Sequence, residues 1–214
     1  MLGENLSAIR EGIAEACKKA GRNPEEVKLV AVTKNRSIGK INELISLGVR
    51  DLGENKLQEL LGKVDSVEGV NWHFVGHLQS NKARKAVENC EWIHSVDSLK
   101  LAAKIDSAAS EIGKRQKILL EVNVSGEKSK YGLEPEKLGD VVGEIKKMRN
   151  LDLQGFMAMA PLVGAEETRR YFSALKELGE KFNLPELSMG MSNDFAVAVE
   201  EGATMVRIGT SLFE

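Results

Sequence analysis

The sequence predicts an α/β protein built as a single (β/α)8 TIM barrel, and three observations lead to this prediction. The stretch from Lys28 to Asn35 begins as an apolar, β-branched run without in-and-out alternation, which is typical of a parallel strand covered by helices. Strand and helix patterns then alternate until eight strand segments are reached, whereas open doubly wound sheets more often stop at five or six. Only Thr210–Glu214 follow the last strand, so we expect an extra N-terminal helix to cover the gap in the outer ring.

The expected elements can be placed in chain order. The first helix covers residues 4–20, has Leu6, Ile9 and Ile13 on one face, and ends at Gly21. After the first strand, which ends at Lys34, we expect strands at 49–52, 71–75, 91–95, 117–124, 151–157, 186–190 and 203–208. Between the strands we expect helices at 37–47, 55–65, 80–89, 97–112, 134–149, 165–182 and 193–201, long enough to cross back over a parallel sheet.

Length and composition restrict the possible functions. The 214 residues contain no linker or low-complexity segment, so we expect one domain, residues 1–214. The net charge is −2 and paired lysines lie on predicted helices beside acids, which argues against nucleic acid as a partner. No run is long and apolar enough for a membrane span, and Cys17 and Cys90 lack a CxxC partner. We therefore expect a soluble, cytoplasmic protein with two ordinary buried cysteines. The sequence leaves monomer and dimer open, and we expect a monomer.

The residues that follow the strands are the candidates for a functional site, because a barrel brings the carboxyl ends of its strands to one mouth. Lys34 ends the first strand, Asn55 follows the second, and His77 follows the third. For Lys34 alone, the alternative is a lysine whose charged end simply reaches solvent.

The loops after the seventh and eighth strands predict a phosphate site, since barrels usually bind phosphate there. Ser192 or Asn193 would cap the next helix and leave backbone N–H groups free for an anion. After Arg207, Gly209 permits close approach of the backbone and Thr210 offers a hydroxyl. Ordinary turn chemistry is the alternative for either loop alone.

A lysine opposite a phosphate site suggests a Schiff base with a phosphorylated aldehyde or ketone. A lysine amine is mostly protonated at neutral pH, so Lys34 would need burial or a cationic neighbour to become a nucleophile. We expect the apolar strand behind Lys34 to provide that burial.

His73 and His77 have the spacing of a zinc-binding helix, but their neighbours predict a strand and its end. On a strand the two rings would not be aligned as on one helix face, and no cysteine or third histidine completes a ligand set. We therefore expect no metal site and interpret His77 as a stacking or hydrogen-bonding wall of the barrel mouth.

Several motifs that together span nearly the whole chain resemble the pyridoxal phosphate homeostasis protein family. The most specific are Trp72–Lys82 (WHFVGHLQSNK) and Leu187–Asp194 (LSMGMSND). The others are Leu29–Lys34, Gly53–Asn55 with Gln58-Glu59, Ser129–Leu133 and Val206–Thr210.

This resemblance implies a fold-type III barrel, like the N-terminal domain of alanine racemase, that holds pyridoxal 5′-phosphate (PLP) as an internal aldimine. Lys34 matches the aldimine lysine. By the same resemblance, the phosphate ligands are Ser192, Gly209 and Thr210, the group facing the pyridine nitrogen is Arg207, and the neighbours of the ring are Asn55 and His77.

The resemblance also implies a function in intracellular PLP (vitamin B6) homeostasis and amino-acid balance, without an established catalytic reaction and with PLP-dependent apoenzymes as candidate partners. The main alternative is a PLP-dependent amino-acid racemase. Alanine racemase, however, takes its second base, a tyrosine, from an additional domain that this chain lacks, and Tyr131 could at most substitute for it. A barrel aldolase is a third reading, although aldolases commonly carry their lysine on a middle or later strand. Glu214 directly follows Phe213, where family members usually continue with glycine and a few residues, and we expect this difference to affect the barrel wall and not the site.

Overall fold

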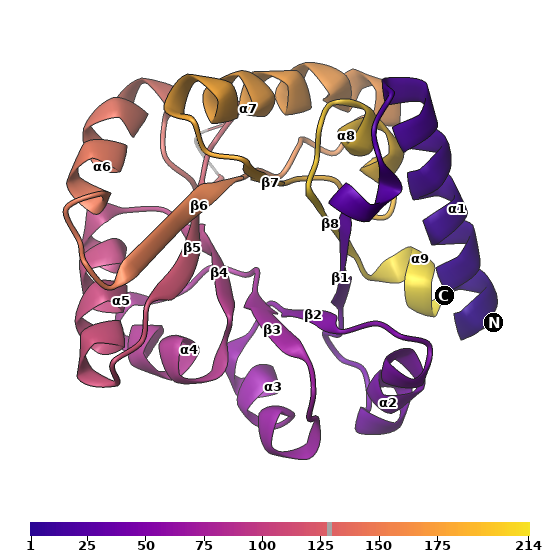
Figure 1. Cartoon of the computed structure of the whole chain (residues 1–214), viewed down its shortest axis with the longest axis horizontal. Helices are drawn as coiled ribbons and strands as arrows, with labels where there is room; N and C mark the ends of the chain where they lie inside the picture. Colours follow the sequence, from indigo (N-terminus) through magenta and orange to yellow (C-terminus); the bar gives the residue numbers. More distant parts are fainter. Residues whose placement is uncertain (128–129) are drawn as a thin grey trace.

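The computed structural model describes residues 1–127 and 130–214 and shows a closed barrel of parallel strands surrounded by helices (Figure 1). Each strand pairs in parallel with the next along the chain, and the last pairs with the first. The strands of the described residues are β1 (Lys28–Val32), β2 (Asp51–Glu54), β3 (Asn71–Phe74), β4 (Trp92–Val96), β5 (Gln116–Glu121), β6 (Leu151–Met157), β7 (Glu186–Ser188) and β8 (Met205–Ile208). The predicted (β/α)8 barrel is therefore confirmed.

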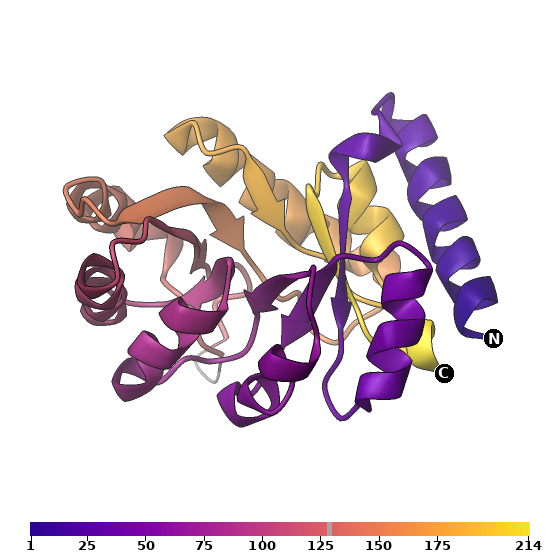
Figure 2. The same cartoon turned by 60° about the horizontal axis from the view of Figure 1, so that its bottom comes forward.

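The helices lie outside the strands, as Figure 2 shows from a second direction. Their bounds are α1 (Leu2–Ala20), α2 (Ile38–Ser46), α3 (Leu57–Leu61), α4 (Ala83–Asn89), α5 (Leu99–Glu111), α6 (Leu138–Ile145), α7 (Arg169–Phe182), α8 (Phe195–Glu200) and α9 (Thr210–Phe213). The helix expected at 55–65 is wrong in length, because α3 ends at Leu61 and a separate 3-10 turn covers Val64–Ser66. Lys63, between the two, turns its side chain into the protein.

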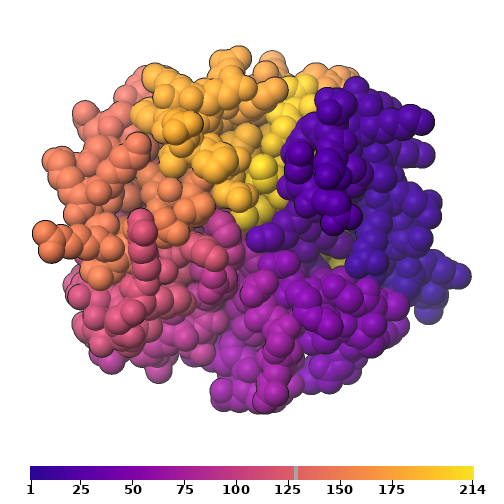
Figure 3. Space-filling model, viewed as in Figure 1, coloured from indigo at the N-terminus to yellow at the C-terminus, as the bar shows by residue number. Residues whose placement is uncertain are grey.

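Helix α1 closes the outer ring, as the sequence predicts. It packs against α8, α9 and α2, and the Asn5 side chain donates a hydrogen bond to the carbonyl of Leu212 at 3.2 Å. The four-residue α9 is too short to cover this side of the barrel, so the apolar face of α1 takes its place. In the space-filling view, residues from the C-terminal part of the chain, yellow, lie against residues from its N-terminal part, indigo (Figure 3).

Two separate apolar clusters stabilise the barrel. The larger lies between the strands and the surrounding helices. The smaller fills the inside of the barrel and consists of Val30, Trp92, Leu119, Met157 and Met205. Since the interior is packed with side chains, space for a ligand remains only beyond the strand ends.

Two further observations concern cysteines and membranes. Both cysteines are free and buried, and burial raises the pKa of the Cys90 thiol to about 12. In the described part of the chain, no helix has both the length and the hydropathy needed to cross a membrane.

Candidate functional site

A cavity of about 580 Å³ opens at the carboxyl ends of the strands, a volume typical of small-molecule sites. Six of the seven residues predicted for the site line it: Lys34, Asn55, Ser192, Arg207, Gly209 and Thr210. The barrel thus brings residues from the two ends of the chain to one place. The cavity is also lined by the loop after β6, residues 159–163, which includes the exposed Met159, Leu162 and Val163.

Lys34 lies in a turn, two residues beyond the end of β1. Strand β1 ends at Val32, and Asn35 adopts a left-handed conformation with φ of 58°, which asparagine tolerates better than most residues. This turn carries the Lys34 side chain out of the packed wall and into the cavity rim, where it is exposed. The expectation that the apolar strand would bury the Lys34 amine is therefore wrong for this structure, because the turn begins before the lysine.

A buried ion pair fixes the backbone directly before Lys34. The Lys63 amine donates to the Thr33 carbonyl at 2.8 Å and to the Glu54 carboxylate. Thr33 donates its hydroxyl to the same Glu54 oxygen at 2.6 Å, and all three side chains are buried. Removing one partner of such a pair leaves an uncompensated buried charge. The position of Lys34 thus depends on β2 and on the turn after α3.

A second contact fixes the backbone directly after Lys34. The Asn35 N–H donates to the Glu59 carboxylate of α3 at 2.7 Å. Glu54 and Glu59 both belong to the GEN and QE motifs that carry the family resemblance. These carboxylates hold the lysine turn from either side, which gives the motifs a positioning role.

The loops after β7 and β8 are tied together by Ser192. Its hydroxyl accepts a hydrogen bond from the Ser211 N–H at 3.2 Å. The prediction that Ser192 or Asn193 caps the next helix is wrong, because the N-cap of α8 is Asp194. The Asp194 carboxylate instead accepts the Met191 N–H at 2.6 Å, within the loop. Ser192 is therefore available to the cavity as part of a bridge between two loops.

Gly209 and Thr210 form the wall beside β1. A Cβ atom added at Gly209 would make only an ordinary contact, 3.5 Å from Val32. Glycine at position 209 is therefore not needed to avoid a clash. Its missing side chain leaves the backbone open to the cavity. The Ser211 hydroxyl next to them is buried without a hydrogen-bond partner among the described residues, so this corner holds an unused polar group.

Asn55 owes its place to a close approach of two loops. A Cβ atom on Gly76 would lie 2.1 Å from the Asn55 carbonyl oxygen, so only glycine fits at that position. The glycine of the WHFVGH motif thus allows the loop after β3 to pack against Asn55.

His77 lies outside the main cavity. It contributes, with Asn55, to a smaller neighbouring cavity. Its ring stacks on Tyr131 with centroids 4.0 Å apart and an angle of 16°, and its Nδ1 lies 3.3 Å from the Asp97 carboxylate. Since Tyr131 lines the main cavity, His77 supports that wall from behind and contacts the cavity only through Tyr131.

Arg207 is buried at the bottom of the cavity. Its Nη1 donates to the carbonyl and the hydroxyl of Ser188 at 2.7 and 2.8 Å, and its Nη2 donates to the Ala158 carbonyl at 3.0 Å. Burial lowers the pKa of the Arg207 guanidinium to about 10, and the charges of Glu121 and Asp194 oppose this effect. Arg207 therefore remains a cation at neutral pH and can only donate hydrogen bonds.

Comparison with known proteins agrees with this geometry. Residues 5–214 match the family described as alanine racemase, N-terminal domain. The chain is 43% identical to the pyridoxal phosphate homeostasis protein of Pseudomonas aeruginosa, over 99% of this chain and 94% of that protein. It is 41% identical to the protein of the same name from Aquifex aeolicus, over 98% and 96%. The chain belongs to the pyridoxal phosphate homeostasis protein family.

Solved structures agree with membership in the pyridoxal phosphate homeostasis protein family. PipY of Synechococcus elongatus PCC7942, solved with PLP bound, is 37% identical, has a TM-score of 0.87, and is matched over 100% of both chains. An alanine racemase of Clostridium difficile 630 has a TM-score of 0.73 at 15% identity, over 95% of this chain and 56% of that one. At that identity the likeness concerns the fold alone.

In this family member, sequence reasoning missed one titratable group near Arg207. Glu121, the last residue of β5, is buried. Burial raises the pKa of its carboxyl to about 7, the charge of Asp97 adds to this effect, and Arg207 opposes it. Period-two alternation along β5 could have placed Glu121 inside the barrel, but nothing in the sequence shows which charges it meets there.

Part of one motif lies outside the described residues. The family motif Ser129–Leu133 begins at Ser129, which the structure does not describe. The described remainder includes Lys130 and Tyr131, and both line the cavity.

Proposed function

We propose that this chain binds PLP at the barrel mouth, with Lys34 bonded to the aldehyde carbon, and that it serves PLP homeostasis rather than a dedicated reaction. One observation carries this proposal. A single cavity combines an accessible amine, Lys34, with the hydroxyls of Ser192 and Thr210, the open backbone at Gly209, and a buried arginine. This donor set fits an aldehyde, a phosphate and a ring nitrogen on one small molecule.

Each of these residues would contact a different part of the ligand. PLP supplies an aldehyde carbon that condenses with an amine and releases water. Ser192 and Thr210 would hold the phosphate, because hydroxyl and backbone donors to an anion form strong hydrogen bonds. Asn55 would lie beside the ring, while His77 would keep the Tyr131 ring in place.

Arg207 disfavours transamination and leaves racemisation dependent on well-placed bases. Because a guanidinium only donates, a pyridine nitrogen facing Arg207 must accept a hydrogen bond and remain unprotonated. A ring in that state gives little stabilisation to a neighbouring carbanion. The names of the relatives agree, since they describe homeostasis proteins rather than enzymes.

A PLP-dependent racemase is the second candidate, and Tyr131 is the observation that keeps it open. This tyrosine lines the cavity and is half exposed, so it could reach a bound amino acid. Its hydroxyl would then have to act as the second base that alanine racemase takes from elsewhere.

Three further features complete the main proposal: PLP-dependent apoenzymes as partners, a cytoplasmic location and a monomeric state. The two free buried cysteines agree with a reducing compartment.

The first test is covalent mapping of the lysine. The chain incubated with PLP is expected to turn yellow, to bleach on borohydride reduction, and to yield a peptide modified at Lys34. Lys34→Arg should abolish the colour, while Lys40→Arg, an exposed lysine of α2, serves as the matched control. A modified peptide at another lysine, or a colourless chain, would contradict the proposal.

The second test concerns the phosphate. Losing the charge-assisted hydrogen bonds to the phosphate, each worth about 1.5–3 kcal/mol, should weaken binding of unphosphorylated pyridoxal at least about tenfold. Ser192→Ala should weaken PLP but not pyridoxal. Equal affinity for the two ligands would show that the loops after β7 and β8 do not form the anion site.

The third test separates carrier from racemase. The yellow chain with L-alanine in deuterated water should show no more than trace α-proton exchange, and it should restore activity to a cofactor-free PLP enzyme. Rapid exchange with appearance of D-alanine would favour the racemase instead. Reactivation no faster than spontaneous release of PLP would exclude directed transfer.

A further inference from the structure

A continuous line of hydrogen bonds crosses the inside of the barrel. Asp51 Oδ1 lies 3.0 Å from His73 Nε2, and His73 Nδ1 lies 2.9 Å from His94 Nε2. His94 Nδ1 lies 2.8 Å from the Ser188 hydroxyl, which accepts from Arg207 Nη1 at 2.8 Å. The partner of His73 is thus His94, and not His77, whose sequence spacing drew attention first.

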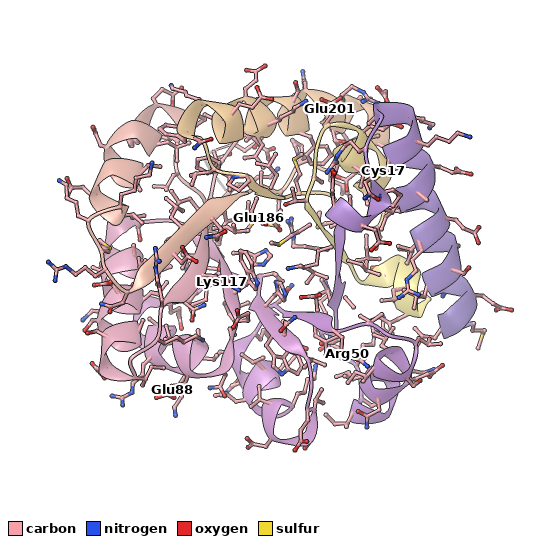
Figure 4. The ribbon with its side chains drawn as sticks, in the orientation of Figure 1. Cys17, Arg50, Glu88, Lys117, Glu186 and Glu201 are labelled. Carbon is pink, nitrogen blue, oxygen red and sulfur yellow. The ribbon has the colours of Figure 1, made fainter. Side chains whose placement is uncertain are left out.

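The line connects the two ends of the barrel. Asp51 is the first residue of β2, and its carboxylate lines a cavity on the face opposite the mouth. Figure 4 shows that face, with Arg50, Lys117 and Glu186 labelled near the starts of their strands. At the other end, Arg207 lines the mouth cavity. The side chains between them are completely buried.

Only one arrangement of protons satisfies every member. Arg207 can only donate, so the Ser188 hydroxyl accepts from it and gives its own proton to His94 Nδ1. His94 then carries its proton on Nε2 and donates to His73 Nδ1. His73 in turn carries its proton on Nε2 and donates to Asp51, whose carboxylate can only accept. The donor-only and acceptor-only ends therefore assign both tautomers.

The reverse arrangement fails at both ends. With His73 Nε2 unprotonated, its lone pair would face the Asp51 carboxylate. With His94 donating from Nδ1, the Ser188 oxygen would receive two donors and its own proton would lack this acceptor. Buried donors and acceptors left without partners each cost about 1–3 kcal/mol, so the forward arrangement is strongly preferred.

Burial is the main reason that the pKa values of both rings are lowered. Burial lowers the pKa of His94 well below its usual value, and the charges of His73, Arg207 and Lys28 act in the same direction. Burial also lowers the pKa of His73, helped by Lys28, while Asp51 and Glu91 oppose this effect.

The Trp92 ring adds to the enclosure. It stacks on His73 with centroids 6.0 Å apart and an angle of 3°. Lys28 lies over the same Trp92 ring at 5.1 Å.

One of the three hydrogen bonds that hold Arg207 belongs to this line. Its guanidinium is buried, and the hydrogen bonds it makes in residues 1–127 and 130–214 go to Ser188 and Ala158 rather than to a carboxylate. Three of its five N–H groups donate to Ser188 and Ala158. The Nε–H and one Nη2–H take no part in these three hydrogen bonds, and Arg207 lines the mouth cavity.

We propose that Asp51, His73, His94 and Ser188 are positioning residues that form one directional hydrogen-bond chain and hold Arg207 for the ring of the ligand. Asp51 supplies the negative end of the chain on the far face of the barrel. This inference rests on the proposed function for the identity of the ligand, but the order of the protons in the chain does not depend on it.

The first arm of the test measures the positions of the protons in the hydrogen-bond chain directly. Long-range proton–nitrogen spectra of the full-length protein with labelled histidine, with and without PLP, should show His73 and His94 as neutral rings protonated on Nε2 at pH 7 to 8. The exposed His77 serves as the reference ring. A proton on Nδ1 of His94, or a charged His73 or His94 in this range, would overturn the proposal, and this arm needs no substitution that could disturb folding.

The second arm perturbs the far end. Asp51→Asn replaces the acceptor-only carboxylate by an amide that can also donate, so both histidine tautomers should appear. Hydrogen exchange of the Arg207 side chain should become at least about tenfold faster, and the visible band of the PLP-loaded chain should shift. Asp65→Asn, the same change at an exposed residue, is the control and should change neither signal.

The outcomes separate the two proposals. If Asp51→Asn leaves the histidine tautomers and the hydrogen exchange of Arg207 unchanged, the hydrogen-bond chain from Asp51 to Arg207 does not act as proposed. If the tautomers change while unsubstituted protein forms no coloured adduct with PLP, the positioning chain stands and the proposed function fails.

Discussion

Glu121 should make the stability of this protein depend on pH in a way that a single substitution removes. The pKa of its carboxyl is raised from 4.5 to about 7, with burial as the main cause. Between these values the folded chain holds a proton that the unfolded chain has released, so stability falls as pH rises through this window. Each pKa unit corresponds to 1.36 kcal/mol, so the ionised Glu121 costs about 3 kcal/mol above pH 7.

Glu121→Gln keeps the shape of the side chain and removes the titration. The variant should match the unsubstituted chain near pH 4.5 and should exceed it by up to about 3 kcal/mol at pH 8. Urea unfolding of both ligand-free proteins at several pH values measures this difference, in which all other titrating groups cancel. Glu68→Gln makes the same change at an exposed position and reports any effect of the substitution itself. A difference that is constant with pH, or that favours glutamate at high pH, would refute the reasoning.

Two further substitutions test the packing around the site. Lys63→Met leaves the Glu54 carboxylate buried without its partner and should lower the free energy of unfolding by about 3–5 kcal/mol. In urea unfolding, the double variant with Glu54→Gln should recover most of this loss. A single variant as stable as the unsubstituted protein would contradict the role of the ion pair. Gly155→Ala places a Cβ 1.7 Å from the Glu186 carbonyl oxygen and must separate β6 from β7, so thermal unfolding should show a Tm lower by about 10 °C or more. Gly143→Ala in α6 is the control, because its Cβ meets nothing within 4 Å and should raise Tm by a few degrees. A Tm that also rises in Gly155→Ala would show that β6 and β7 can adjust to the added Cβ.

Sequence patterns were most informative where a residue's surroundings are local. The apolar run of β1 and the amphipathic pattern of α1 can each be recognised from residues close together in the sequence, so the barrel and its extra helix could both be predicted. The motifs before and after strand ends placed Lys34 and Thr210 at the same mouth, because parallel strands in a barrel all end on one side. The same reasoning failed for the cap of α8, where Asp194 and not Ser192 occupies the N-cap, since several residues with similar propensity follow one another there.

What the sequence alone determined is the fold, the family and six of the seven residues predicted for the mouth, because period, strand order and motif are properties of short segments. What only the tertiary structure decided is how those residues are charged and held. The exposure of Lys34 follows from a strand that ends at Val32, two residues earlier than expected, and the support of Lys34 by Glu54 and Lys63 joins separate βα units. The line from Asp51 to Arg207 joins five strands whose residues are up to 156 positions apart. Such contacts depend on closure of the barrel, and no local pattern specifies them.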